Sequence, residues 1–168
     1  LYKYTPLQTS YGINMLALVN NKPVVLGLKE ALEHYLDHQF DVLVRKTAYD
    51  LKKAEERKHI LDGLVIALNH IDEIIEIIRG AYDDAESQIM ETFKLSSEQA
   101  KAILEMRLRR LSGLEREKIN SELEDLILAI EEFTTILNSK DKQTEVIQGE
   151  LESLKKTFGD DRRTEISQ

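Results

Sequence analysis

The stretch Leu104–Glu117 reads Leu-Glu-Met-Arg-Leu-Arg-Arg-Leu-Ser-Gly-Leu-Glu-Arg-Glu and is the most informative part of the chain for its architecture. It predicts a basic, leucine-rich helix that ends at Ser112-Gly113 and a heptad helix that starts at once after it. Long amphipathic helices lie on both sides of this turn, and they hide their apolar faces by pairing antiparallel. The sequence therefore predicts a mainly α fold: a long antiparallel coiled-coil stalk with a small globular helical tip.

Composition and charge agree with long helices and limit the functions to consider. Hydrophobic residues make up 42% and charged residues 32%, with only two prolines, which favours helices over sheets or disorder. The net charge is −8, and since affinity for the DNA backbone depends on clustered cations, we expect no tight DNA binding by this chain alone. The absence of cysteine excludes disulfides and thiolate metal sites.

The ends of the chain suggest a part of a longer protein. The chain begins with Leu1 rather than Met, and it contains neither a signal segment nor an uncharged apolar run long enough to span a membrane. Residues 159–168 form a polar tail that we expect to lead to a missing C-terminal domain.

Residues 1–28 predict a short β-hairpin before the stalk. Apolar segments at 13–19 and 23–26 flank Asn20-Asn21-Lys22, and asparagine tolerates the positive φ angles that a tight hairpin turn requires. Pro23 at the start of the second strand suits an edge strand.

The two arms of the stalk are predicted at residues 29–79 and 114–158. In the first arm, apolar residues recur at spacings of three, four and seven, which predicts one helix of about 75 Å that stops at Gly80. The return arm has the most regular spacing in the chain, and a polar stretch interrupts it. We expect a break near Asn138-Ser139, and this break is our candidate hinge.

The tip is predicted at residues 80–113, as two short helices at about 83–93 and 97–111 that open with capping boxes. The second helix has one apolar face, which can pack on the end of the stalk or on a second copy of the tip. We favour a second copy, through a two-fold contact, because two short helices cannot bury both sides of their apolar surface. The predicted dimer interface consists of Ala100, Ile103, Leu104, Arg107, Leu108 and Leu111.

A group of basic residues on the first arm has two interpretations. They are able to share one helix face, where they would touch a passing polyanion, or they belong to an ordinary solvated face with pairs between residues three or four apart. The second interpretation is the simpler one. The stripe consists of Arg45, Lys46, Lys52, Lys53 and Arg57.

Catalytic and metal sites have little support in the residues. His34 and His38 have the spacing that a zinc site needs, but a solvated charged face explains them more simply. None of the six tyrosines lies in a recognisable nucleophile setting, and no phosphate-binding loop occurs. We therefore assign no catalytic, cofactor-binding or metal-binding residue to the chain.

Several segments in order resemble one family over essentially the whole chain. They are the runs at residues 1–15, 57–64, 99–118 and 158–166, the last reading Phe158-Gly-Asp-Asp-Arg-Arg-Thr-Glu-Ile. Together they resemble the A subunits of bacterial DNA gyrases, which are type IIA topoisomerases. The corresponding part of topoisomerase IV is the nearest alternative, and a purely structural dimeric coiled-coil adaptor is an alternative from another class.

The resemblance implies a place in a larger machine. Residues 1–28 would end the tower domain, 29–79 and 114–158 would be the coiled-coil arms, and 80–113 would be the exit gate (C-gate), where two tips meet and release a transported DNA duplex. The intact enzyme would be a cytoplasmic, nucleoid-associated A2B2 assembly with the gyrase B subunit, which supplies the ATP and Mg sites. The family's catalytic tyrosine follows an arginine, and no Arg-Tyr pair occurs in this chain.

Overall fold

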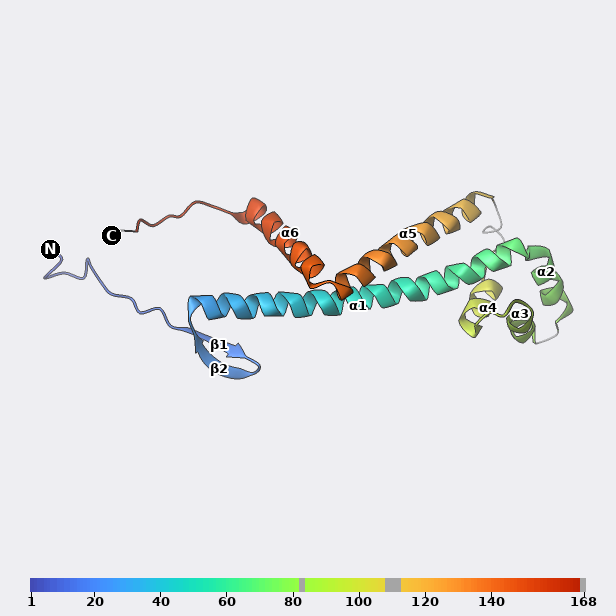
Figure 1. The fold of residues 1–168 in the computed structure, drawn as a ribbon, viewed down its shortest axis with the longest axis horizontal. Helices are drawn as coiled ribbons and strands as arrows, with labels where there is room; N and C mark the ends of the chain where they lie inside the picture. The colour runs from blue at the N-terminus through green and yellow to red at the C-terminus, as the bar shows by residue number, and fades with distance from the viewer. Residues whose placement is uncertain (82–83, 108–112, 167–168) are drawn as a thin grey trace.

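The chain is an elongated helical stalk with a compact tip. The computed structural model describes residues 1–81, 84–107 and 113–166. Figure 1 shows α1 running along the molecule, with α2, α3 and α4 gathered at one end and the hairpin and both termini toward the other. The predicted mainly α fold with a stalk, a tip and an N-terminal hairpin is therefore confirmed. The elements are β1 (Met15–Val19), β2 (Lys22–Leu26), α1 (Leu28–Asn69), α2 (Ile71–Gly80), α3 (Ala85–Phe93), α4 (Ser97–Leu104), α5 (Gly113–Asn138) and α6 (Lys140–Phe158).

The hairpin forms where the sequence predicts it. Strands β1 and β2 pair antiparallel, from Met15 opposite Leu26 to Val19 opposite Lys22. Asn20 and Asn21 form the turn with φ angles of 51° and 63°, in the left-handed region that asparagine tolerates.

Helix α1 begins and ends for different reasons. At its start, the Glu30 carboxylate accepts a hydrogen bond of 2.9 Å from the Gly27 N–H, which satisfies one of the helix's unpaired N-terminal donors. At its end, the prediction of one helix to residue 79 is wrong. α1 stops at Asn69, His70 takes a non-helical conformation, and α2 starts at Ile71 in a new direction.

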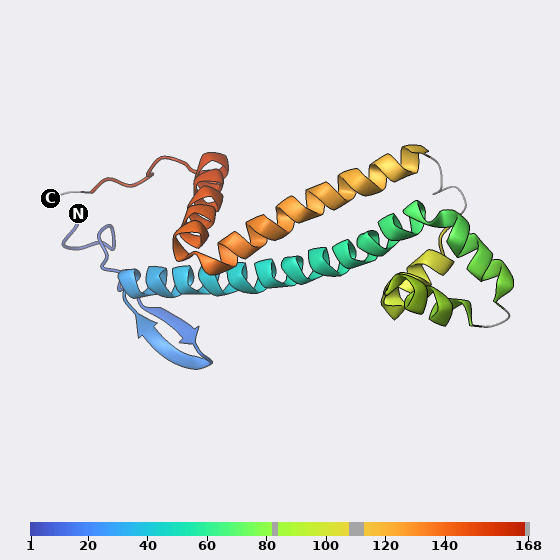
Figure 2. The same cartoon turned by 45° about the vertical axis from the view of Figure 1, so that its right-hand side comes forward.

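The two halves of the return arm differ in their packing. Helix α5 packs along α1, as an antiparallel stalk requires. Helix α6 meets α1 near the break at Ser139 and then diverges from it, as Figures 1 and 2 both show. Its C-terminal apolar residues stay in solvent, Leu154 being 50% and Phe158 76% exposed. Beyond the predicted break, the apolar spacing up to Phe158 therefore does not continue the packing on α1.

The helices of the tip are shorter than the sequence suggests. The capping box at Ser96 and Gln99 is confirmed, but α4 ends at Leu104 instead of continuing to 111. The Met106 N–H donates to the Ile103 carbonyl at 3.1 Å, a tighter turn than an α-helix makes, and Met106 packs on the core. The predicted caps at Asp83 and Ser112 lie outside the described residues.

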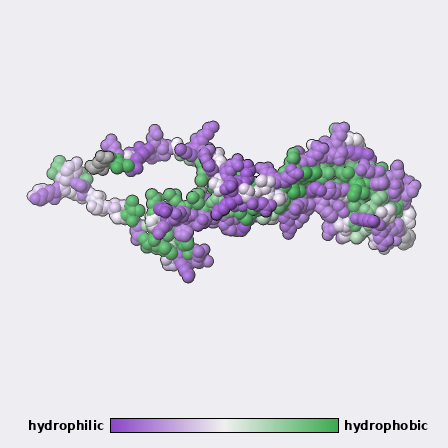
Figure 3. Space-filling view, viewed as in Figure 1, coloured by the Kyte–Doolittle hydropathy of each residue, from purple (hydrophilic) through white to green (hydrophobic). Residues whose placement is uncertain are grey.

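The main core lies where the stalk meets the tip. Buried residues from α1, α2, α3, α4 and α5 form one cluster, so the tip is packed on the stalk and does not hang from it. Figure 3 shows hydrophobic surface over the hairpin and along the tip end of the stalk. The cluster consists of Leu61, Leu64, Ala67, Leu68, Ile74, Ile89, Leu95, Ala100, Ile103 and Ile119.

Candidate functional site

A polar contact fixes the tip on the stalk. Gln99, which opens α4, is buried, and its Nε2 donates to the His59 carbonyl of α1 at 2.7 Å. The His59 ring and the Ser96 hydroxyl form a second hydrogen bond of 2.8 Å across the same contact. Gly63 leaves the space for this, because a Cβ there would lie 2.8 Å from Gln99 Cβ and Cγ. Helix α4 therefore has one defined position on α1.

This packing revises the predicted dimer interface. Ala100 is 0% and Ile103 3% exposed, and both belong to the core of the tip. A second copy cannot contact them unless the tip opens, so the prediction is corrected for these two residues. Leu104 and Arg107 are exposed and stay candidates. Leu108 and Leu111 lie outside the described residues.

An apolar patch on the outside of the tip is the stronger candidate contact. The strongly amphipathic helix α2 buries Ile74 and leaves further isoleucines toward solvent. Ile78 is 41% and Leu104 37% exposed, and both line a shallow cavity of about 80 Å³ between α2 and α4. We call Ile71, Ile75, Ile78, Leu104 and Met106 the tip patch.

The predicted basic stripe is largely paired within the chain. The Arg45 Nη2 lies 2.8 Å from the Asp41 Oδ2. The Nζ atoms of Lys52 and Lys53 lie 3.9 Å and 2.8 Å from the carboxylate oxygens of Glu56. This pairing lowers the net positive charge of the face, as the solvated-face interpretation expects. Lys46 is exposed and forms no ion pair with another described residue. A contact between this stripe and DNA stays a prediction.

The hydrogen bond between Lys53 and Glu56 shifts the pKa of both groups. The hydrogen bond from Lys53 lowers the pKa of the Glu56 carboxyl, and the same bond raises the pKa of the Lys53 ammonium. Both side chains are solvent-exposed, so the pair adjusts local charge and contributes little to stability.

Arg57 has a different role from the rest of the stripe. Its Nε and Nη2 donate to the two carboxylate oxygens of Glu122 on α5, at 2.7 Å and 3.0 Å. The bidentate hydrogen bond raises the pKa of Arg57. Because Arg57 comes from α1 and Glu122 from α5, this pair links the two arms of the stalk. The sequence offers no signal for it, since the residues are 65 positions apart.

The predicted break at Asn138-Ser139 is confirmed, and its bonding is specific. Helix α5 ends at Asn138, and the Ser139 hydroxyl accepts from the Lys142 N–H at 3.2 Å as the N-cap of α6. The Gln143 side chain donates to the Ile136 carbonyl at 2.9 Å, which covers the end of α5. We call this joint the elbow. Its movement as a hinge stays a prediction.

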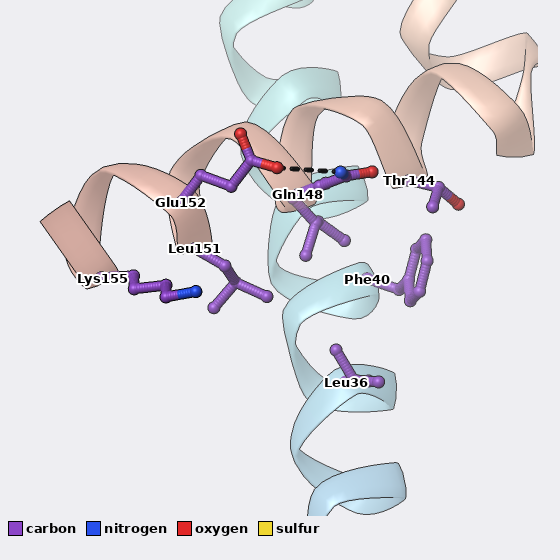
Figure 4. A pocket seen from close by; sticks show the side chains of 8 residues that line it. Leu36, Phe40, Thr144, Gln148, Leu151, Glu152 and Lys155 are labelled. Carbon is purple, nitrogen blue, oxygen red and sulfur yellow. Dashed lines mark hydrogen bonds between the residues drawn. The ribbon is translucent and has the colours of Figure 1, made fainter. Parts of the chain in front are cut away.

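Beyond the elbow, α6 and α1 enclose an open apolar groove of about 290 Å³, which Figure 4 shows. Leu36 and Phe40 of α1 face Leu151 of α6 across it, and Gln148 bonds Glu152 at its rim at 2.9 Å. The groove is also lined by Thr144, Gln148, Glu152 and Lys155 of α6. It is the unfilled space between two helices that diverge.

The described residues form neither a cluster of metal ligands nor a membrane-spanning helix. His34 and His38 are exposed on α1, and in the ranges 1–81, 84–107 and 113–166 no three potential metal ligands come together. Within those same residues, no helix combines the length and hydropathy of a membrane span.

Comparison with known proteins places the chain in a family. Residues 1–152 match the family described as the A subunit of DNA gyrase and topoisomerase IV, and the chain belongs to this family. The A subunit of DNA gyrase from Staphylococcus aureus is 55% identical over 168 residues, which cover 99% of this chain and 19% of that protein. The A subunit of DNA gyrase from Staphylococcus epidermidis matches with the same identity and coverage. The chain thus spans about a fifth of the length of these relatives.

Proposed function

We propose that this chain is the stalk and exit gate of a gyrase-type A subunit, in which two copies meet through their tips. The observation that carries the proposal is the tip patch, an apolar surface at the end of the stalk remote from both termini. Ile78 and Leu104 are exposed and the other three residues of the tip patch are half-buried, and apolar side chains gathered at the surface of a folded tip are typical of a protein contact. Membership of the family of gyrase and topoisomerase IV A subunits supports the proposal.

The small area of the tip patch suits a contact that must open and close. The tip patch holds five apolar residues, so the buried area is small compared with that of a permanent dimer. A modest contact closes reversibly, and the stalk holds it far from the chain ends where other domains would connect. Passage of a DNA duplex between the stalks of the two copies would then require only that the tips part.

The chain contributes no catalytic group in this proposal. The catalytic tyrosine would belong to another part of the gyrase-type protein, and ATP and Mg would bind to the gyrase B subunit in an A2B2 assembly. The DNA would pass through the cavity between the stalks of the two copies without tight binding, which agrees with the net charge of −8. The proposed compartment is the bacterial cytoplasm, at the nucleoid.

The names of the relatives favour gyrase over topoisomerase IV within the family. The matched family covers both enzymes, whereas both Staphylococcus relatives are named as DNA gyrase. In the adaptor alternative the tip contact would be the same, and only an assay of supercoiling in the whole protein separates the two.

Light scattering over a concentration series tests the tip contact. We expect a dimer that dissociates on dilution, and the double substitution Ile78→Asp with Leu104→Asp should leave a monomer with unchanged helix content. Both side chains are exposed, so their replacement does not disturb the core. Leu128→Asp is the matched control, because Leu128 is 65% exposed on α5 and lies outside the tip patch. A dimer that survives the double substitution would contradict the proposal.

A further inference from the structure

The break between α1 and α2 is not marked by a helix-breaking residue in the sequence. Residues 66–78 read Ile-Ala-Leu-Asn-His-Ile-Asp-Glu-Ile-Ile-Glu-Ile-Ile and hold neither glycine nor proline. Such a segment is expected to form one helix, and sharp kinks in helices need an identifiable cause. No side chain caps the N–H groups of α2 at His70, although the His70 Nδ1 lies 3.3 Å from the Glu73 Oε1 in its first turn. A contact from elsewhere in the fold also reaches the joint.

Arg116 of α5 supplies such a contact. In a continuous helix the Leu68 carbonyl would accept the N–H of Asp72, four residues later. In the structure, Arg116 Nη2 donates to the Leu68 carbonyl at 2.6 Å. The His70 N–H bonds the Ile66 and Ala67 carbonyls at 3.2 Å and 3.3 Å, so the end of α1 is closed without α2. A cation at a helix C-terminus also interacts favourably with the helix dipole.

Burying the Arg116 side chain costs free energy, which its hydrogen bond to the Leu68 carbonyl must offset. Its Nε is buried and finds no hydrogen-bond partner among the described residues. A buried donor without a partner is rare in folded proteins and needs an explanation. Within the described part of the chain, the guanidinium is hydrogen-bonded to the Leu68 carbonyl, so it is held at the joint by the acceptor that the break exposes.

The surroundings of the joint leave room for movement. A cavity of about 330 Å³ lies beside it, lined by Asn69, His70 and Glu73 together with Arg116. On the other side, the His70 ring lies 5.4 Å from the ring of Phe93 in α3, so the joint also touches the body of the tip. A change at the joint would be transmitted directly to the tip.

The elbow at Ser139 makes a useful contrast. Its bonds come from Ser139 and Gln143, which are within a few residues of the break, so the elbow is determined locally. The α1–α2 joint has the local contact between His70 and Glu73 and, in addition, a bond from a side chain 48 positions away on the return arm. The two joints therefore respond differently when α5 shifts along α1.

We propose that Arg116 is a latch through which the return arm holds α2, the first helix of the tip, at one angle to α1. While α5 stays docked on α1, the bond to Leu68 keeps the α1–α2 joint bent. When α5 shifts, the joint loses this bond and α2 becomes able to change its angle, while Gln99 keeps α4 on α1. The latch does not rest on the proposed exit gate, because it concerns the joint within one copy of the chain.

Spin-label distance measurements test the latch in the 168-residue chain, which contains no native cysteine. Labels at Glu55→Cys on α1 and Glu76→Cys on α2 would be about 31 Å apart along a straight helix, within the range of the method. Unlabelled chain in excess removes distances between copies. A second pair, Glu55→Cys with Leu128→Cys, reports on the stalk alone.

Arg116→Gln should raise the population of chains in which α2 lies at another angle to α1 by about tenfold. This is the effect of losing a hydrogen bond that involves a charged group. The stalk pair should not change, which separates a latch from general loosening. Lys118→Gln is the matched control, because among the described residues Lys118 pairs with the nearby Glu115 and not with the joint. An Arg116→Gln chain that folds and keeps the original distance distribution would overturn the proposal.

A second variant decides the matter if Arg116→Gln does not fold by circular dichroism. Arg116→Met removes the bond to Leu68 together with the buried Nε that lacks a partner among the described residues, and it keeps a side chain of similar length. A broader distribution between the labels on α1 and α2 supports the latch. An unchanged distribution would refute it, because the joint would then keep its angle without the bond to Leu68.

Discussion

Gly63→Ala should destabilise the tip, although alanine is the better helix former. Gly63 lies inside α1, where the exchange of glycine for alanine stabilises an unobstructed helix by about 1 kcal/mol. At this position the new methyl group would lie 2.8 Å from Gln99 Cβ and Cγ and 3.1 Å from Cδ. These atoms belong to a buried side chain at the start of α4, so α4 itself must move.

The expected loss in the free energy of unfolding has two parts, the overpacked contact and the weakened hydrogen bond of Gln99. Overpacking a tight contact costs about 1–3 kcal/mol, and the hydrogen bond from Gln99 to the His59 carbonyl is worth about 1 kcal/mol. Against the gain in helix propensity, the net change in the free energy of unfolding is a loss of about 1–3 kcal/mol.

Urea unfolding followed by far-UV circular dichroism measures this change. Gly149→Ala is the matched control, because Gly149 lies in α6 with nothing within 4 Å of the added methyl group. The control should be neutral or stabilising. If Gly63→Ala is as stable as the original chain, α4 does not occupy the position on α1 that the structure gives it.

Three further predictions concern the stalk and the elbow. A double-mutant cycle on Arg57 and Glu122 should give a coupling of about 0.5–1 kcal/mol that falls in high salt, since the pair is bidentate but half exposed; a coupling of zero at low salt would contradict the pairing. Ser139→Ala should cost about 1 kcal/mol and speed hydrogen exchange in the first turn of α6, and unchanged exchange would show that the cap is not formed. Lys53→Gln should raise the pKa of Glu56 toward its ordinary value in an NMR titration, because the hydrogen bond from Lys53 is the largest cause that lowers it. A lowered carboxyl pKa stabilises the fold above the unfolded-state pKa and ceases to do so as the pH falls through the folded-state pKa, so this pH dependence should disappear in the variant.

Local signals in the sequence predict the elements that local chemistry determines. The Asn20-Asn21 turn, the capping box at Ser96 and the break at Asn138-Ser139 all rest on residues within a few positions of each other. Each is confirmed because a turn or a cap satisfies its backbone groups with neighbouring side chains.

The features that the sequence does not predict depend on contacts between residues far apart in the chain. Arg116 of another helix donates a hydrogen bond to the Leu68 carbonyl at the joint, and the regular spacing of isoleucines in α2 conceals the break. The burial of Ile103 depends on α4 docking on α1, whereas its spacing alone fits a dimer face equally well. Helix α6 keeps a heptad pattern up to Phe158, but a pattern does not show which surface covers it.

Cross-linking through a single cysteine tests whether two tips meet. The chain has no cysteine, so Ile78→Cys can form a disulfide only with the same residue of a second copy. A two-fold contact through the tip patch brings the patch positions nearest its axis beside their own copies, so cysteine is placed singly at Ile71, Ile75, Ile78 and Leu104 in turn. We predict rapid oxidation to a covalent dimer for at least one of these variants while Leu128→Cys stays monomeric. Cross-linking of Leu128→Cys equal to that of every patch variant, or none for any patch variant at concentrations where the chain is dimeric, would contradict a gate closed by its tips.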